Sequence, residues 1–176
     1  MQSGVGLPVT VGLPLATFLS SELDLTERDQ NLIEALLLDG MPVDDPATAV
    51  IEDGSRLALA AGLPGIAGLA MNKNSAVKAL RGAITHKNRE ETRPRAGRVT
   101  LALYSLVLPA LGGHFLKKGL FISPSQFQRY ARFASDDLCI FDDRQASASD
   151  LAHELSAAQT PEDLFLTAII AEAGNG

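Results

Sequence analysis

The chain has 176 residues, of which 46% are hydrophobic and 20% are charged, and its net charge is −6. This composition is typical of globular proteins and excludes a disordered chain, and the length fits a single domain over residues 1–176. A single cysteine excludes an intramolecular disulfide, and the basic start of a secretory signal is missing, so we expect a cytoplasmic protein.

The first predicted helix begins at a capping signal. Thr26 precedes a carboxylate at Asp29, three residues later, as the first turn of a helix prefers. Apolar residues then recur at helical spacing over residues 32–37. Asp39-Gly40 is the stop signal that we expect to end this helix.

A turn signal follows at Asp53-Gly54. The apolar runs 48–52 and 55–60 flank it, and two residues of this type favour the tight turn of a β-hairpin. The alternative is a helix that begins at Asp45-Pro46, with Asp45 as its cap. The hairpin is the preferred interpretation.

The second half of the chain alternates between strand and helix signals. Residues 99–108 are apolar on both faces, which is typical of a strand in a sheet covered by helices. Ser123 and Gln126 form a capping box, and Thr160 starts the last helix. Shorter elements are predicted at 120–122, 138–141, 148–157 and after Asn74 or Ser75. We therefore expect an α/β or α+β fold, a single layered domain with a mixed sheet covered by helices.

A glycine-rich stretch follows the predicted strand 55–60 and precedes a helix. Backbone N–H groups in such a loop, together with a helix N-terminus, favour anions. The spacing is G-x-x-G-x-x-G, which matches neither the dinucleotide fingerprint nor the P-loop. The alternative is a tightly packed chain in which glycine permits close approach.

Positive charge is concentrated in residues 73–98. This window holds eight of the 15 Lys and Arg and carries about +6, whereas the rest of the chain carries about −12. Within it, residues 87–97 are predicted to be a solvated basic loop. A small anionic ligand would bind here, the alternatives being a loop that is merely solvated and a subunit contact. The candidate ligand-binding residues are Gly62, Gly65, Gly68, Lys73, Lys78, Arg81 and Arg93.

Two aspartate pairs bracket the predicted strand 138–141. Carboxylates at the end of a strand can hold Mg²⁺, so Asp136, Asp137 and Asp142 are candidate metal ligands, although aspartate is also an ordinary turn residue. His114 follows two glycines and is a candidate for catalysis, with a structural role as the alternative. Cys139 is interpreted as a small core residue.

Two functions fit these observations. The first is a protein that binds a small anionic or phosphorylated ligand through the glycine-rich turn and the basic segment. The second is a non-catalytic subunit that forms a homo-oligomer, or docks on a partner, through basic and acidic faces.

No nucleic-acid partner is expected, because the chain is acidic and no aromatic residues interleave with the arginines. No membrane partner is expected either, because the apolar runs 57–71 and 99–113 are shorter than the ~20 residues of a membrane helix. The sequence leaves open whether the protein is an enzyme and which cofactor it uses.

Overall fold

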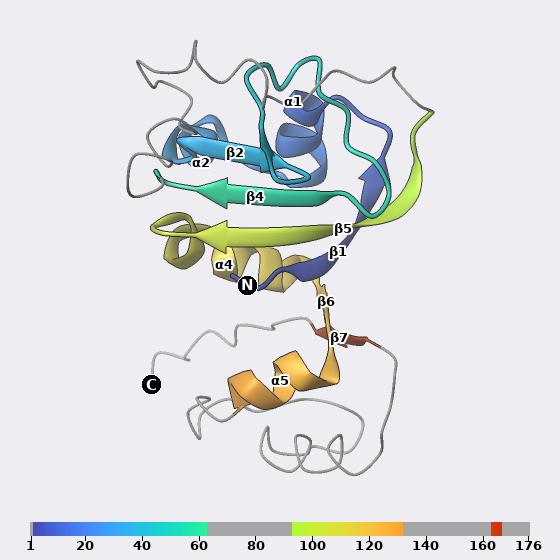
Figure 1. Ribbon diagram of the computed structural model, residues 1–176, viewed down its shortest axis with the longest axis vertical. Helices are drawn as coiled ribbons and strands as arrows, with labels where there is room; N and C mark the ends of the chain where they lie inside the picture. Colours follow the sequence, from blue (N-terminus) through green and yellow to red (C-terminus); the bar gives the residue numbers. More distant parts are fainter. Residues whose placement is uncertain (1, 63–92, 132–162, 167–176) are drawn as a thin grey trace, which may run out of the picture. The chain divides into compact units, whose positions relative to one another are not determined.

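The computed structural model describes residues 2–62, 93–131 and 163–166 (Figure 1). These residues divide into two compact units, one up to Leu120 and one from Phe121 to Leu166, and each is described by itself. The elements predicted after Asn74 or Ser75 and at 138–141 and 148–157 lie outside the described residues. The single domain over residues 1–176 stays a prediction.

The first unit is built on a mixed sheet, as predicted. Its strands follow the order β3-β2-β4-β5-β1. The parallel pair is β4 with β5, and the neighbours β1–β5, β2–β4 and β2–β3 are antiparallel. The strands are β1 (Val5–Val11), β2 (Ala35–Leu38), β3 (Met41–Pro42), β4 (Arg56–Ala60) and β5 (Arg95–Tyr104). Figure 1 shows β4 and β5 side by side along their length.

One face of this sheet carries large aliphatic side chains. The register places Leu57 opposite Leu101 and Leu59 opposite Leu103, and none of these four is exposed. Because side chains alternate between the faces of a strand, these residues share one face with the buried leucines and valines of β1 and β2. This face is the core of the unit, and burial of such side chains is the main source of its stability.

The helices described in the first unit cover this face. They are α1 (Leu15–Thr17), the π-helix η1 (Phe18–Glu22), α2 (Glu27–Leu32) and α4 (Val107–Lys118). Helix η1 contacts β1, and α4 contacts β4 and β5. The His114 ring lies with Nε2 2.8 Å from the Leu23 carbonyl, and Lys118 Nζ donates to the Glu22 carbonyl at 3.1 Å. These two contacts hold α4 beside the chain that follows η1.

The first predicted helix is confirmed at its start and wrong at its end. Thr26 and Asp29 form the capping box of α2, but the helix ends at Leu32. Residues 35–38 form β2, in which Leu36 and Leu38 are buried. A short, continuous apolar run fits a buried strand as well as a helix, and pairing with β4 and β3 decides for the strand. Asp39-Gly40 is the turn between β2 and β3, with both residues at positive φ.

The predicted turn at Asp53-Gly54 is confirmed, and the hairpin is wrong. Ser55 N–H donates to the Glu52 carbonyl at 3.1 Å, and Gly54 has a φ of 81°. Residues 48–52 do not pair with β4, whose neighbours are β2 and β5, and Val50 forms an isolated bridge with Pro14. The alternative helix at Asp45 is also absent: its carboxylate caps a single turn by accepting the Ala47 N–H.

The apolar run that was predicted as one strand, 99–108, is divided between two elements. Strand β5 ends at Tyr104, Ser105 adopts a φ of 51°, and α4 begins at Val107. His114 and the two glycines before it therefore lie inside a helix, α4. At its other end β5 begins at Arg95, so the last three residues of the predicted basic loop pair with β1.

The second unit contains β6 (Leu120–Ile122), α5 (Pro124–Ala131) and β7 (Leu164–Leu166). The predicted capping box of α5 is confirmed, because Gln126 N–H donates to Ser123 Oγ at 3.2 Å and Gln126 Oε1 accepts the Ser123 N–H at 2.9 Å. The helix predicted from Thr160 is wrong at 164–166, which form β7 beside β6. Phe121 and Phe165 pack there with ring centroids 5.0 Å apart. None of the helices described in either unit is long and apolar enough to span a bilayer.

Candidate functional site

The second face of the first unit's sheet differs from the core face in the size of its side chains. Along β4 and β5 the register pairs alanines with one another or with a polar residue. Ala60 and Ala102 are fully buried, whereas Ala58 is half-buried. The residues of this face are Ala35 and Leu37 in β2, Arg56, Ala58 and Ala60 in β4, and Thr100, Ala102 and Tyr104 in β5.

A hollow of about 260 Å³ lies on this second face. Leu37 and Ala58, which are register partners on β2 and β4, belong to its lining. Gly40 from the β2–β3 turn adds open backbone, and Arg56 and Tyr104 are the other described residues of the lining. Among its described lining residues, the hollow therefore combines aliphatic side chains with an arginine and a tyrosine.

Arg56 starts β4, and its backbone is held by Asp39. The Asp39 carboxylate accepts the Arg56 N–H at 2.8 Å and the Ser55 hydroxyl at 3.4 Å. The Arg56 side chain is exposed, and it makes no hydrogen bond or ion pair with the described residues. A Cβ at Gly4 would lie 3.6 Å from Arg56 Nη1 and 2.6 Å from Thr100 Cγ2. Glycine at this position therefore leaves room for the Thr100 methyl group, and the Arg56 guanidinium lies nearby at ordinary contact distance.

The opposite end of the hollow lies at the carboxyl ends of the two parallel strands. Tyr104 is the last residue of β5, and the next residue, Ser105, donates its hydroxyl to the Gly62 carbonyl at 3.2 Å. Gly62 has a φ of 75°, and a Cβ there would lie 3.0 Å from Glu34 Oε2. The first predicted ligand-binding residue thus lies at the strand ends where ligands of open α/β sheets commonly bind.

Gly62 and Arg93 are the predicted site residues that the structure describes, and they lie at opposite ends of β5. Gly62 contacts the residue after the strand, and Arg93 lies two residues before it. Ten strand residues at about 3.3 Å each separate these ends by roughly 30 Å, so one small ligand does not reach both. The other candidates lie outside the described residues: Gly65, Gly68, Lys73, Lys78, Arg81, Asp136, Asp137 and Asp142.

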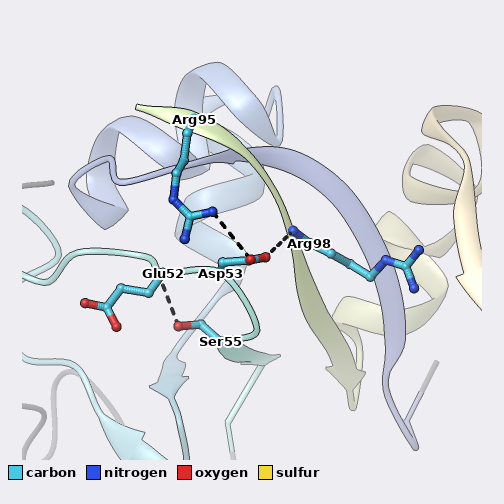
Figure 2. Close-up of polar contacts among 5 residues, drawn as sticks. All are labelled: Glu52, Asp53, Ser55, Arg95 and Arg98. Atoms are coloured by element: carbon cyan, nitrogen blue, oxygen red, sulfur yellow. Dashed lines mark hydrogen bonds and ion pairs between the residues drawn. The ribbon is translucent and has the colours of Figure 1, made fainter. Parts of the chain in front are cut away.

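Figure 2 shows that part of the predicted basic window is engaged within the fold. Asp53 Oδ1 accepts the Arg98 backbone N–H at 2.8 Å, and Arg95 Nη1 lies 3.5 Å from Asp53 Oδ2. The Gly54 N–H donates to the Arg98 carbonyl at 2.8 Å. The Arg98 N–H and, secondarily, the Arg95 guanidinium hold the pKa of Asp53 below its usual value. This cluster fastens the 53–54 turn to the start of β5, which is a structural role.

The remaining candidates for chemistry are His114 and the predicted metal ligands. His114 is bonded to a backbone carbonyl and stacks edge-on against Phe115 at 5.3 Å, which favours the structural alternative. In the part of the chain that the structure describes, no three His, Cys, Asp or Glu residues are grouped to hold a metal ion. The acidic residues after Ser135, on which the self-association hypothesis rests, are outside the described residues except Asp163. That hypothesis stays a prediction.

Sequence reasoning missed Arg56 and Tyr104. The alternation Arg56-Leu57-Ala58-Leu59-Ala60 was a usable signal, because it places the arginine on the same face as two alanines. The pairing of this face with Tyr104 needed the strand register, which sequence alone does not supply. Comparison with protein-family models, curated proteins and solved structures found no match to this chain.

Proposed function

We propose that this chain is a cytoplasmic protein that binds a small anionic ligand in the hollow on the second face of its sheet. The observation that carries the proposal is Arg56, which lines an apolar hollow and whose guanidinium is unpaired among the described residues. Pockets with an apolar lining and a few convergent polar groups are the usual form of small-molecule sites. The Gly62 carbonyl accepts the hydroxyl of Ser105, the residue after Tyr104, and Gly62 stays a candidate for contact with the ligand.

The positive charge of the exposed Arg56 side chain supports an anionic ligand. The acidic residue linked to it by hydrogen bonds is Asp39. Its carboxylate accepts the backbone N–H of Arg56 and the hydroxyl of Ser55 at the start of β4. Among the described residues, this carboxylate forms no ion pair with the Arg56 guanidinium. An incoming carboxylate or phosphate would therefore meet a free five-donor group.

A ligand screen by thermal shift at low salt tests the proposal. The panel contains small carboxylates, phosphate esters and neutral analogues, and a ligand at 100 times its dissociation constant adds about 2.7 kcal/mol to the stability. We expect an anion that raises the unfolding temperature of the wild-type chain and loses most of this effect with Arg56→Gln.

Arg28→Gln is the matched control. It removes the same charge from an exposed position in α2, on the helix-covered side of the sheet. The anion should stabilise this variant as it does the wild type. An anion that stabilises wild type and Arg56→Gln equally would place the site elsewhere and contradict the proposal.

A further inference from the structure

We infer that Thr100 is a second binding residue of the proposed site, and that its hydroxyl donates to the anion that Arg56 holds. This inference rests on the proposed function and adds to it a polar side chain on the neighbouring strand. It follows from the strand register, from the direction of the Arg56 side chain, and from the hydrogen bonds of both residues.

Arg56 and Thr100 are direct neighbours in the sheet. They are register partners of the parallel strands β4 and β5, and both belong to the second face. Neighbouring strands lie about 4.8 Å apart, so the two side chains leave the sheet side by side.

The Arg56 guanidinium lies over Thr100 and toward Gly4. A Cβ on Gly4 would be 2.6 Å from Thr100 Cγ2 and 3.6 Å from Arg56 Nη1, so both side chains border the same space beside Gly4. The charged group of a ligand at this guanidinium would therefore lie on the β5 side of Arg56, next to the hollow that Arg56 lines. An anion in that place meets Thr100 as well.

The Thr100 hydroxyl has hydrogen-bonding capacity for such an anion. Thr100 is half-buried, and its hydroxyl makes no hydrogen bond with Arg56 or with any other described residue. A hydroxyl that is partly removed from water gains from a partner, and its bond to a charged acceptor is stronger than its bond to a neutral one.

The backbone holds both residues in place. The Thr100 N–H donates to the Ser55 carbonyl at 2.8 Å, and the Arg56 N–H donates to Asp39 Oδ1 at 2.8 Å. Threonine is branched at Cβ, so its side chain has few conformations on a strand. Binding groups on strands are positioned more precisely than groups on loops, which favours joint recognition by this pair.

An oxyanion suits the pair because it offers more than one acceptor oxygen. One oxygen would accept from the Arg56 guanidinium and another from the Thr100 hydroxyl. Carboxylates and phosphates share this chemistry, whereas an uncharged amide offers one oxygen and no charge. The inference therefore concerns oxyanions as a class, and the experiment includes both kinds.

Paired substitutions test the inference by isothermal titration calorimetry at low salt on the full chain, with benzoate, inorganic phosphate and uncharged benzamide as probes. Thr100→Val removes the hydroxyl and keeps the branched shape, whereas Thr100→Ser keeps the hydroxyl. We expect the oxyanion that binds the wild type to bind Thr100→Val about 10- to 150-fold more weakly, the range that one hydrogen bond to a charged group implies. Thr100→Ser should bind it nearly as well as the wild type does, and benzamide should not distinguish the variants.

Thr10→Val is the matched control. Thr10 lies on the same face of the sheet, in β1, opposite Ala96 of β5. Ala96 is four strand residues, or roughly 13 Å, from Thr100, so the same chemical change is made away from Arg56. The oxyanion should bind this variant as it binds the wild type. Urea unfolding shows whether each variant is folded, and Thr100→Ala, which also lacks the hydroxyl, replaces Thr100→Val if that variant does not fold.

The outcomes separate this inference from the proposed function. Wild-type affinity of Thr100→Val, with binding still lost in Arg56→Gln, would overturn the role of Thr100 and leave the anion site in place. Equal losses in Thr100→Val and Thr100→Ser would also overturn it, because the shape of the residue and not its hydroxyl would then matter. Failure of both oxyanions to bind the wild-type chain at millimolar concentration would contradict the proposed function and this inference together.

Discussion

Gly97 lies where β5 closely approaches β1 and the turn at Asp53-Gly54. Its backbone has no conformation that requires glycine, yet a Cβ there would lie 2.8 Å from Val11 Cγ2 and 3.0 Å from Asp53 Oδ1. Val11 is 1% exposed, so it has little space into which to move. The perturbation we consider is Gly97→Ala, which adds one methyl group at this contact.

Two effects of opposite sign decide the result. Replacing a glycine within a strand by alanine favours folding by about 0.5–1 kcal/mol, because the unfolded chain loses conformational freedom. Overpacking a well-packed site disfavours folding by about 1–3 kcal/mol, because side chains and backbone must shift. A contact at 2.8 Å to a buried valine places this site within that range. We expect the free energy of unfolding to fall by about 1 kcal/mol.

Urea unfolding, followed by far-ultraviolet circular dichroism, measures this change. With a slope of about 2 kcal/mol per molar urea, the midpoint should fall by about 0.5 M. Gly113→Ala is the control, because a Cβ at Gly113 meets nothing within 4 Å and the residue lies inside α4. That variant should gain about 1 kcal/mol from helix propensity. If Gly97→Ala is stabilised like Gly113→Ala, the close approach of β5 to Val11 and Asp53 is refuted.

Three further predictions concern single contacts of the first unit. Asp53 has a lowered pKa, so its contribution to stability is present above its usual value of 3.8 and is lost as the pH falls through the lowered value. The difference in unfolding free energy between wild type and Asp53→Asn should therefore be constant from pH 7 to about pH 5 and shrink below that; a difference that does not change down to pH 2 would contradict the contact with Arg98. Thr26→Ala should lose about 1 kcal/mol in urea unfolding and Thr26→Ser should lose little, and equal values for both would refute the cap. His114→Leu leaves the Leu23 carbonyl without its donor and should lose about 1–3 kcal/mol in the same assay, whereas a neutral result would argue against this hydrogen bond.

The sequence predicts well those features that depend on a few neighbouring residues. The caps at Thr26 and Ser123 are correct because a side chain and the backbone three residues away satisfy each other locally. The turn at Asp53-Gly54 is correct for the same reason, because Gly54 takes the positive φ that the turn requires. The strand that the turn leads into, β4, is also correct, but its partner is not. Partners come from distant parts of the chain, and no local signal identifies them.

Apolar runs explain most of the errors. Residues 35–38 and 99–108 are apolar at nearly every position, so their pattern does not distinguish a buried strand from a buried helix. In the first run pairing with β4 decides for a strand. In the second, Ser105 at positive φ ends the strand, and Pro109 then falls in the first turn of α4, where its missing N–H does no harm. The candidate site has the same limit, because Arg56 and Tyr104 are 48 positions apart in sequence and only the strand register places them on the same face of the sheet.

The parallel pairing of β4 and β5 also bears on the concentration of positive charge in residues 73–98. Parallel neighbours require the chain to leave one strand at its carboxyl end and to enter the next at its amino end. The chain accordingly leaves the sheet near Gly62 and returns at Arg93, at the other end of β5. Charges that are close in sequence across this connection need not be close in space, and at its returning end Arg95 is paired with Asp53. The proposed anion site takes its arginine, Arg56, from a strand within the sheet, and it does not require the whole basic window to gather around one ligand.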